Sequence, residues 1–151
     1  MKHTVKKAAA FLVFLTLAVA IFSLARMNTE FVTLSYEGTR VTADAVAVAM
    51  PTALADSMAR EITPSGIELS FDVRGEATVT VSGGCLYTVS ADGADIVSLG
   101  SETAITEDSV LWWTVDGDEG EFLLTVTADG KQSVFVLELN ENTPDGVIYK
   151  K

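Results

Sequence analysis

The chain of 151 residues contains a single cysteine, Cys85, and a single histidine, His3. One cysteine excludes an intramolecular disulfide, so a domain built from this chain relies on its hydrophobic core. The sequence also lacks a Gly-x-Ser-x-Gly elbow, a Cys/His pair behind the N-terminus and a cluster of zinc ligands. We therefore expect a protein that is not an enzyme and that holds no cofactor.

Basic side chains are scarce outside the N-terminus. The chain has 10 Lys and Arg against 21 Asp and Glu, which gives a formal net charge of -11. Four of the ten basic residues lie in residues 1–26 and no acid does, so the remainder carries 6 basic against 21 acidic side chains, or -15. Such a surface repels phosphate backbones, which argues against nucleic acid as a partner.

Apolar residues, by contrast, dominate the N-terminus. A head that contains Lys2, Lys6 and Lys7 precedes the uncharged residues 8–25, and Arg26 follows them. This order is typical of a segment that directs a chain into the secretory route, with the positive charges kept on the cytoplasmic side. We expect everything after Arg26 to lie outside the cytoplasm.

Residues 1–26 are either a cleaved signal peptide or a membrane anchor. Residues 18–20 (Ala-Val-Ala) and 23–25 (Ser-Leu-Ala) have the small-x-small pattern of a cleavage site. As a helix, residues 8–25 would span about 27 Å, close to the roughly 30 Å hydrocarbon core of a bilayer. We favour the anchor, which makes the membrane a partner through residues 8–25 if the segment is uncleaved.

Behind this segment the hydrophobic pattern divides the chain. Residues 27–63 form an extension in which Phe31–Tyr36 is predicted as a strand and Thr52–Glu61 as a short amphipathic helix. Residues 64–140 alternate apolar and polar side chains over roughly seven short strands, with turns every eight to twelve residues or so. Residues 141–151 are expected to be a C-terminal tail.

Several stretches resemble strands of a known domain family. Asp118–Leu124 (DEGEFLL) resembles the Asp-x-Gly-x-Tyr-x-Cys stretch that leads into strand F of immunoglobulin-like domains. Gly75–Val81 looks like strand B of that family, and Leu111–Val115 is similar to strand E. Tyr87 lies near the place of the strand C tryptophan.

The resemblance implies a bacterial immunoglobulin-like domain without the disulfide. Its fold is an all-β antiparallel sandwich, here preceded by the N-terminal apolar helix and one short amphipathic helix. Val81 and Leu124 stand at the two cysteine positions, and the resemblance implies that they fill the same space between the sheets. Phe122 stands at the tyrosine position without the hydroxyl of the tyrosine corner. The fold carries no activity with it.

Two tryptophans are adjacent on a predicted strand and therefore point to opposite faces. Trp113 is expected in the core, and Trp112 is expected to face outward or to lie under residues 27–62. An exposed tryptophan can stack on a sugar ring or anchor a protein partner, so Trp112 is the candidate partner-binding residue. Cys85 lies in an alternating stretch and is expected to be a small buried side chain.

An acidic loop is a weak candidate for calcium binding. Asp116, Asp118, Glu119 and Glu121 place four carboxylates within six residues that also contain two glycines. Calcium takes six to eight oxygens, roughly, and this spacing lacks the third ligand and the distant bidentate glutamate of a calcium loop. A solvated turn between two strands is the alternative.

These features predict an exported β-sandwich protein with a non-catalytic binding, adhesion or structural role at the bacterial cell surface, anchored in the cell membrane or secreted. Its ligand would be a protein or a glycan. One alternative is a pilin-like filament subunit, which has the same order of apolar helix and β-rich head but requires a prepilin cleavage site that is missing here. Another is a calcium- or carbohydrate-binding accessory module.

We expect cell fractionation to recover the chain with the membranes, at the full mass of 16.0 kDa. A kept anchor of this length holds the chain in the bilayer, whereas cleavage after residue 20 or 25 yields a shorter, soluble product. Intact-mass measurement of the membrane fraction distinguishes the two. Recovery of the chain in sheared surface filaments would contradict the anchored form and favour the filament subunit.

Overall fold

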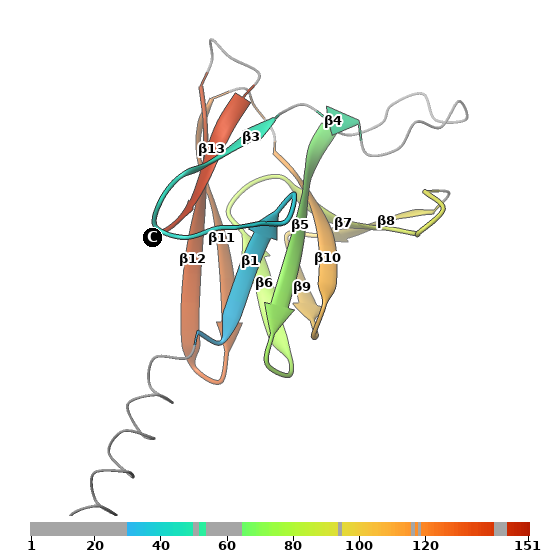
Figure 1. Ribbon diagram of the computed structural model, residues 1–151. Helices are drawn as coiled ribbons and strands as arrows, with labels where there is room; N and C mark the ends of the chain where they lie inside the picture. Colours follow the sequence, from blue (N-terminus) through green and yellow to red (C-terminus); the bar gives the residue numbers. More distant parts are fainter. Residues whose placement is uncertain are drawn as a thin grey trace, which may run out of the picture. The chain divides into compact units, whose positions relative to one another are not determined.

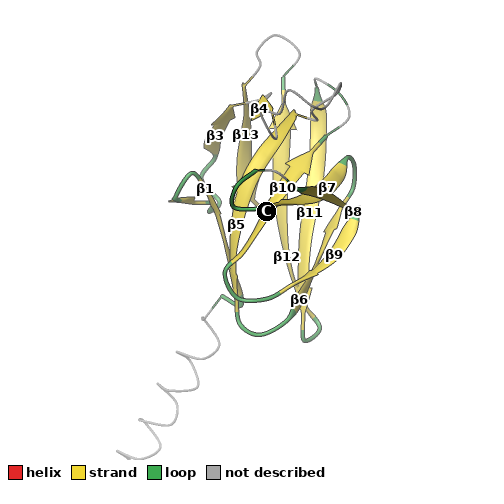
Figure 2. Ribbon diagram, turned by 90° about the vertical axis from the view of Figure 1, so that its right-hand side faces the viewer, coloured by secondary structure: helices red, strands yellow, loops and turns green. Residues whose placement is uncertain are grey.

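All regular elements of the described residues are strands (Figure 2). The computed structural model describes residues 30–49, 52–53, 65–93, 95–115, 117, 119–140 and 145–151. Within these ranges no helix is long and apolar enough to cross a membrane. The apolar segment 8–25 lies outside the described residues. So does most of the predicted helix Thr52–Glu61, whose first two residues form a short strand instead.

The strands form two antiparallel sheets, drawn in Figure 1. Sheet 1 has the order β2-β1-β5-β10-β7-β8, with β4 also paired to β5, and sheet 2 has the order β3-β13-β12-β11-β6-β9. The strands of sheet 1 are β1 (Val32–Tyr36), β2 (Thr39–Arg40), β4 (Thr52–Ala53), β5 (Ser65–Val73), β7 (Cys85–Val89), β8 (Ile96–Gly100) and β10 (Ser109–Thr114). The strands of sheet 2 are β3 (Val46–Ala49), β6 (Ala77–Val81), β9 (Glu102–Ile105), β11 (Gly120–Ala128), β12 (Lys131–Leu139) and β13 (Asp145–Lys150).

The period of two along each strand decides which side chains fill the space between the sheets. On β5, Ile67 and Leu69 are buried, whereas Glu68, which lies between them, is exposed. Phe71, two residues after Leu69, is buried as well. Trp113 on β10 is fully buried, and its Nε1–H donates to the Gly83 carbonyl oxygen at 3.0 Å. That bond satisfies the one polar group of the largest core side chain. The predicted β-sandwich architecture is confirmed.

On each lateral side of the sandwich, one segment of the chain leaves one sheet and enters the other. Between β2 and β3, the Val41 N–H donates to a carbonyl of β1 at 2.8 Å, and the Thr42 carbonyl accepts from β13 at 2.6 Å. Between β8 and β9, the Ser101 carbonyl accepts from β6 at 2.9 Å. Gly100 makes the second crossing possible because its φ of 79° is a backbone conformation that glycine adopts without strain.

The sandwich extends beyond residues 64–140 at both ends. Strand β1 pairs along β5, and the two-residue turn at Glu37 and Gly38 joins it to β2 with positive φ at both positions. Strand β13 pairs with β12 on one side and with β3 on the other. Residues 141–151, expected as a tail, therefore contribute an interior strand, and Phe31–Lys151 form one compact unit.

The strands compared with B and F of the immunoglobulin-like family lie in the same sheet. β6 pairs with β11, and Val81 is the direct cross-strand partner of Leu124. Both side chains are buried between the sheets, as the resemblance implied, but they reach that space from one sheet. Because the B–F disulfide joins two sheets, the comparison of Gly75–Val81 with strand B is wrong.

We expect Gly84→Ala to lower the free energy of unfolding by at least about 3 kcal/mol, because overpacking against backbone adds to backbone strain. Gly84 has a φ of 79°, and a Cβ placed on it would collide with the Thr114 carbonyl oxygen. Gly75 is the matched control, since its φ is 81° and a Cβ there would meet nothing within 4 Å. Gly75→Ala should cost only about 1 to 2 kcal/mol of backbone strain. Chemical denaturation measures both losses, and equal values would contradict the close approach at Gly84.

Candidate functional site

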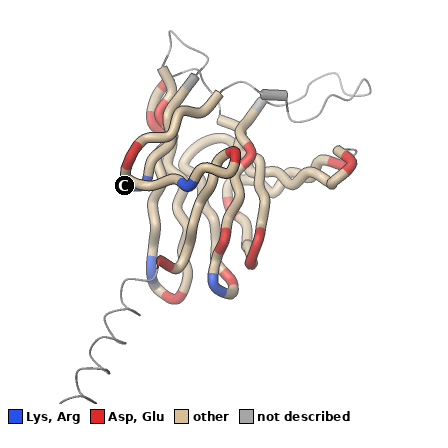
Figure 3. Tube along the Cα trace, in the orientation of Figure 1, with Lys and Arg blue, Asp and Glu red and all other residues tan. Residues whose placement is uncertain are grey.

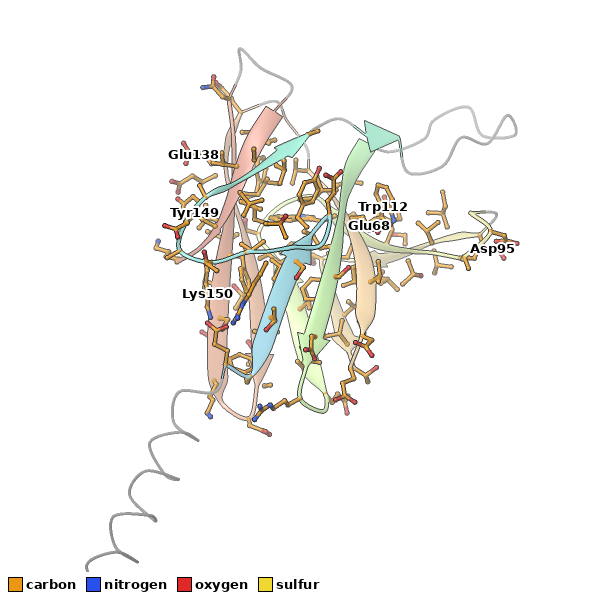
Figure 4. All side chains as sticks on the ribbon, in the orientation of Figure 1. Glu68, Asp95, Trp112, Glu138, Tyr149 and Lys150 are labelled. Carbon is orange, nitrogen blue, oxygen red and sulfur yellow. The ribbon has the colours of Figure 1, made fainter. Side chains whose placement is uncertain are left out.

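The outer side of sheet 1 brings together aromatic and polar side chains from four strands. Trp112 on β10 is the register partner of Glu68 on β5 and of Tyr87 on β7, so the three side chains point to the same side of the sheet. Figure 4 shows Glu68 beside Trp112. Ser98 on β8 is in turn the partner of Tyr87. We name the following set the outer aromatic face: Glu68, Cys85, Tyr87, Ser98, Trp112 and Thr114.

The structure places the two tryptophans on opposite sides of β10. Trp113 is fully buried, which confirms its predicted place in the core, and Trp112 lies half-buried on the outer aromatic face. The predicted cover of Trp112 by residues 27–62 falls in part on residues 27–29, 50–51 and 54–62, which lie outside the described residues. Sequence reasoning selected Trp112 alone on this face. It did not find Glu68 or Tyr87, because their position beside Trp112 depends on strand register.

Cys85 lies on the outer aromatic face, so its predicted burial in the core is wrong. Alternation along β7 turns Leu86 inward, where it is fully buried, and leaves Cys85 partly exposed. The Cys85 Sγ lies 3.2 Å from the Ser98 Oγ, and the Cys85 carbonyl accepts a bond from the Thr114 hydroxyl at 3.2 Å. These contacts tie β8, β7 and β10 together on the outer side of the sheet.

The hydrogen bonds of this face change the acidity of Tyr87. A side-chain hydrogen bond with Cys85 is the main cause that raises the pKa of Tyr87 above its ordinary 10.0, and partial burial adds to the rise. The hydroxyls of Thr114 and Ser98 act in the opposite direction, because they stabilise the phenolate. Near neutral pH Tyr87 is protonated, as a tyrosine with the ordinary pKa of 10.0 also is, and presents a hydroxyl that donates and accepts hydrogen bonds.

The stretch of sequence that supplies three of the four strands of this face contains acids and no bases. From Gly75 to Gly130 there are 11 Asp and Glu and no Lys or Arg over 56 residues. This stretch supplies β6 to β11, and Figure 3 shows its acidic positions at the tips and edges of the strands. The negative field that results favours neutral or cationic ligands over anionic ones.

The acidic loop lies only partly within the described residues. Glu119 and Glu121 are exposed at the start of β11, while Asp116 and Asp118 lie outside the described residues. Among the residues that the structure describes, no group of three or more His, Cys, Asp or Glu side chains is arranged to hold a metal ion. Calcium binding by the four carboxylates stays a prediction from sequence.

Comparison with known proteins adds no family to this picture. The chain matches no protein-family model, no curated protein and no solved structure. The candidate site therefore rests on the geometry of the outer aromatic face and on the distribution of charge around it.

We expect Cys85→Ala to lower the pKa of Tyr87 and Ser98→Ala to raise it further. The first change removes the hydrogen bond that favours the neutral phenol, and the second removes a hydroxyl that stabilises the phenolate. Ultraviolet titration of tyrosine ionisation checks both, with the same curve from Tyr87→Phe subtracted to isolate Tyr87. A pKa that does not change in either variant would contradict the contacts assigned to this face.

Proposed function

We propose that the protein is an exported, membrane-anchored and non-catalytic binding protein of the bacterial cell surface. The outer aromatic face is its contact surface. The observation that carries the proposal is the row Glu68, Trp112 and Tyr87, in which two aromatic rings and a carboxylate share one side of the sheet. Rigid aromatic side chains give a large contact area at little cost in conformational entropy. Residues 8–25 would hold this face at the outer side of the membrane.

A neutral carbohydrate is the ligand whose chemistry fits this surface best. The C–H faces of a sugar ring stack on aromatic rings, and its hydroxyls donate to carboxylates and exchange hydrogen bonds with other hydroxyls. Trp112 and Tyr87 supply the rings, Glu68 supplies an exposed carboxylate, and Ser98 supplies an exposed hydroxyl. An acidic polysaccharide is disfavoured because the 56 residues from Gly75 to Gly130, which supply β7, β8 and β10 of this face, contain 11 acids and no base.

A large flat protein interface fits less well. Stable interfaces bury about 800 Å² on each partner around an apolar centre. In the described part of the chain only two large hydrophobic side chains are strongly exposed, Val97 at 54% and Val110 at 46%. The half-buried aromatic pair is closer in size to a sugar ring than to such an interface.

We also infer that the sandwich is a variant of the immunoglobulin-like fold. In the first half of the domain, its strands correspond to family strands one place later than the sequence comparison predicts. The order β1-β5-β10-β7 corresponds to the family order A-B-E-D, and β12-β11-β6 corresponds to G-F-C. The sequence comparisons of Leu111–Val115 with strand E and of Asp118–Leu124 with strand F agree with this assignment. Strand β6, which was compared with strand B, corresponds to strand C instead. Strands β8 and β9 are then an insertion between D and E.

Affinity electrophoresis tests the proposed contact surface. We expect the full chain, in a detergent without a sugar headgroup, to be retarded in gels that contain a neutral polysaccharide such as a soluble glucan or hydroxyethyl cellulose. Trp112→Ala should lose most of the retardation, since it removes a stacking platform. Val110→Ala is the matched control, because Val110 lies two residues earlier on the same strand and the same side.

Two outcomes would contradict the proposal. If no neutral polysaccharide changes the migration of the wild-type chain, the ligand is not a neutral carbohydrate. If the Trp112→Ala and Val110→Ala variants are retarded equally, the outer aromatic face is not the contact surface. Far-ultraviolet circular dichroism of both variants shows whether the sandwich is intact, so that loss of binding is not confused with loss of fold.

A further inference from the structure

Strand β8 has an open edge. It pairs with β7 on one side and is the last strand on its side of sheet 1, so no strand among the described residues pairs with its other side. Figure 1 shows the β7–β8 hairpin extending away from the rest of the sheet. The neighbouring strands therefore leave the outer edge of β8 accessible.

The register identifies which backbone groups face that edge. The Ser90 N–H donates to the Asp95 carbonyl at 2.9 Å, which marks a hydrogen-bonded pair at the end of the hairpin. Hydrogen-bonded and non-hydrogen-bonded pairs alternate along antiparallel strands, so the pairing of Thr88 with Val97 is the next hydrogen-bonded one. Ile96 and Ser98 consequently direct their N–H and C=O groups away from β7. An added strand would find these groups at ladder spacing.

β8 lacks the charges and the proline that usually protect an edge strand, and its one irregularity is the register shift at Leu99. The sequence Ile-Val-Ser-Leu-Gly contains no charge and no proline, and Val97, its second residue, is 54% exposed. The other edge strands differ: β2 and β4 have two residues each and β2 contains Arg40, β9 contains Glu102, and the exposed residues of β3 are alanines. Among the described edge strands, β8 is therefore the longest, and it combines an uncharged sequence with an exposed large hydrophobic side chain.

We infer that β8 docks an extended segment of a partner protein by β-strand addition, and that this segment has basic residues on both sides of an uncharged centre. Charge complementarity selects this occupant. Asp95 precedes β8 and Glu102 follows it, both exposed, and the chain has no Lys or Arg from Gly75 to Gly130. A second copy is a poorer fit, because antiparallel pairing of two β8 strands brings Asp95 of one chain towards Glu102 of the other. The inference is independent of any ligand on the outer aromatic face.

Three synthetic peptides test the inference on the full chain in detergent micelles. The first is Lys-Lys-Thr-Val-Thr-Val-Thr-Lys-Lys with a fluorescent label, the second replaces each Lys by Glu, and the third is the first peptide with alternate backbone amides N-methylated. Fluorescence anisotropy should show binding of the first peptide, which weakens as salt is raised, and at least about tenfold weaker binding of the other two.

Hydrogen exchange locates the bound peptide. We expect the amide protons of Ile96 and Ser98 to gain protection when the first peptide binds. The amide proton of Val97 should change little, because its partner is already β7. Protection that appears instead on β3, β2 or β9 would overturn the assignment to β8.

Val97→Lys and Val110→Lys form a matched pair of variants. Each places one positive charge at an exposed valine, and only the first lies on the edge strand. Val97→Lys should weaken binding of the first peptide at least about tenfold, and Val110→Lys should leave it within about twofold. Ile96→Pro is a second edge variant, because it removes an outward N–H at the first residue of the strand, where proline is tolerated.

Three results would overturn the inference. One is that the Glu peptide or the N-methylated peptide binds as tightly as the first peptide. Another is binding that Val97→Lys and Ile96→Pro leave unchanged. The third is sedimentation showing that the wild-type chain forms a dimer without peptide and that Val97→Lys is a monomer, since that makes a second copy the occupant of the edge.

Discussion

The register of β10 between β5 and β7 is the constraint on which the rest of the structure depends. Because side chains alternate along a strand, a slip of one residue would turn Trp112 inward and Trp113 outward. Trp113 holds the observed register, since its ring is fully buried and its Nε1–H reaches the Gly83 carbonyl. Glycines stand on both sides of β10: a Cβ on Gly66 would lie 2.7 Å from the Trp113 carbonyl oxygen, and Gly84 is packed against the Thr114 backbone. The register thus places the same strand at the centre of the core and at the centre of the outer aromatic face.

Local pattern was enough to predict most strands and turns. The alternation in β5, β6, β11 and β12 predicts which side chains are buried, and the two-residue turn at Asp129 and Gly130 has the positive φ values that its sequence favours. The same pattern could not predict which strands pair with each other. β6 has the alternation of any inner strand, so nothing local shows that it pairs with β11 and β9 and not with β10. Strand β9 and the interior place of β13 escaped prediction for the same reason.

The site was predicted to a smaller extent than the fold. The adjacency of Trp112 and Trp113 is a local property, and it was sufficient to place one inside and one outside. The neighbours of Trp112 come from strands far away in the sequence, so Glu68 and Tyr87 join it only through pairing. Cys85 was expected in the core because its neighbours are apolar on both sides, yet a single step along β7 gives the inner position to Leu86.

The crossing at Gly100 links the closure of the sandwich to its open edge. A strand that leaves sheet 1 to pair in sheet 2 cannot also continue along the edge of sheet 1, so β8 is joined to the sandwich at Gly100 and through its pairing with β7. Thr88 and Val97 lie on the same side of the hairpin as Leu86, but beyond the point where sheet 2 covers that side. This is why Leu86 is fully buried while Val97 is 54% exposed. The exposure of Val97 is therefore a consequence of topology, and it occurs in the part of the chain where no basic side chain balances the acids. The fold in this way gives β8 both an accessible backbone edge and a negative environment, the two properties that an extended basic segment would recognise.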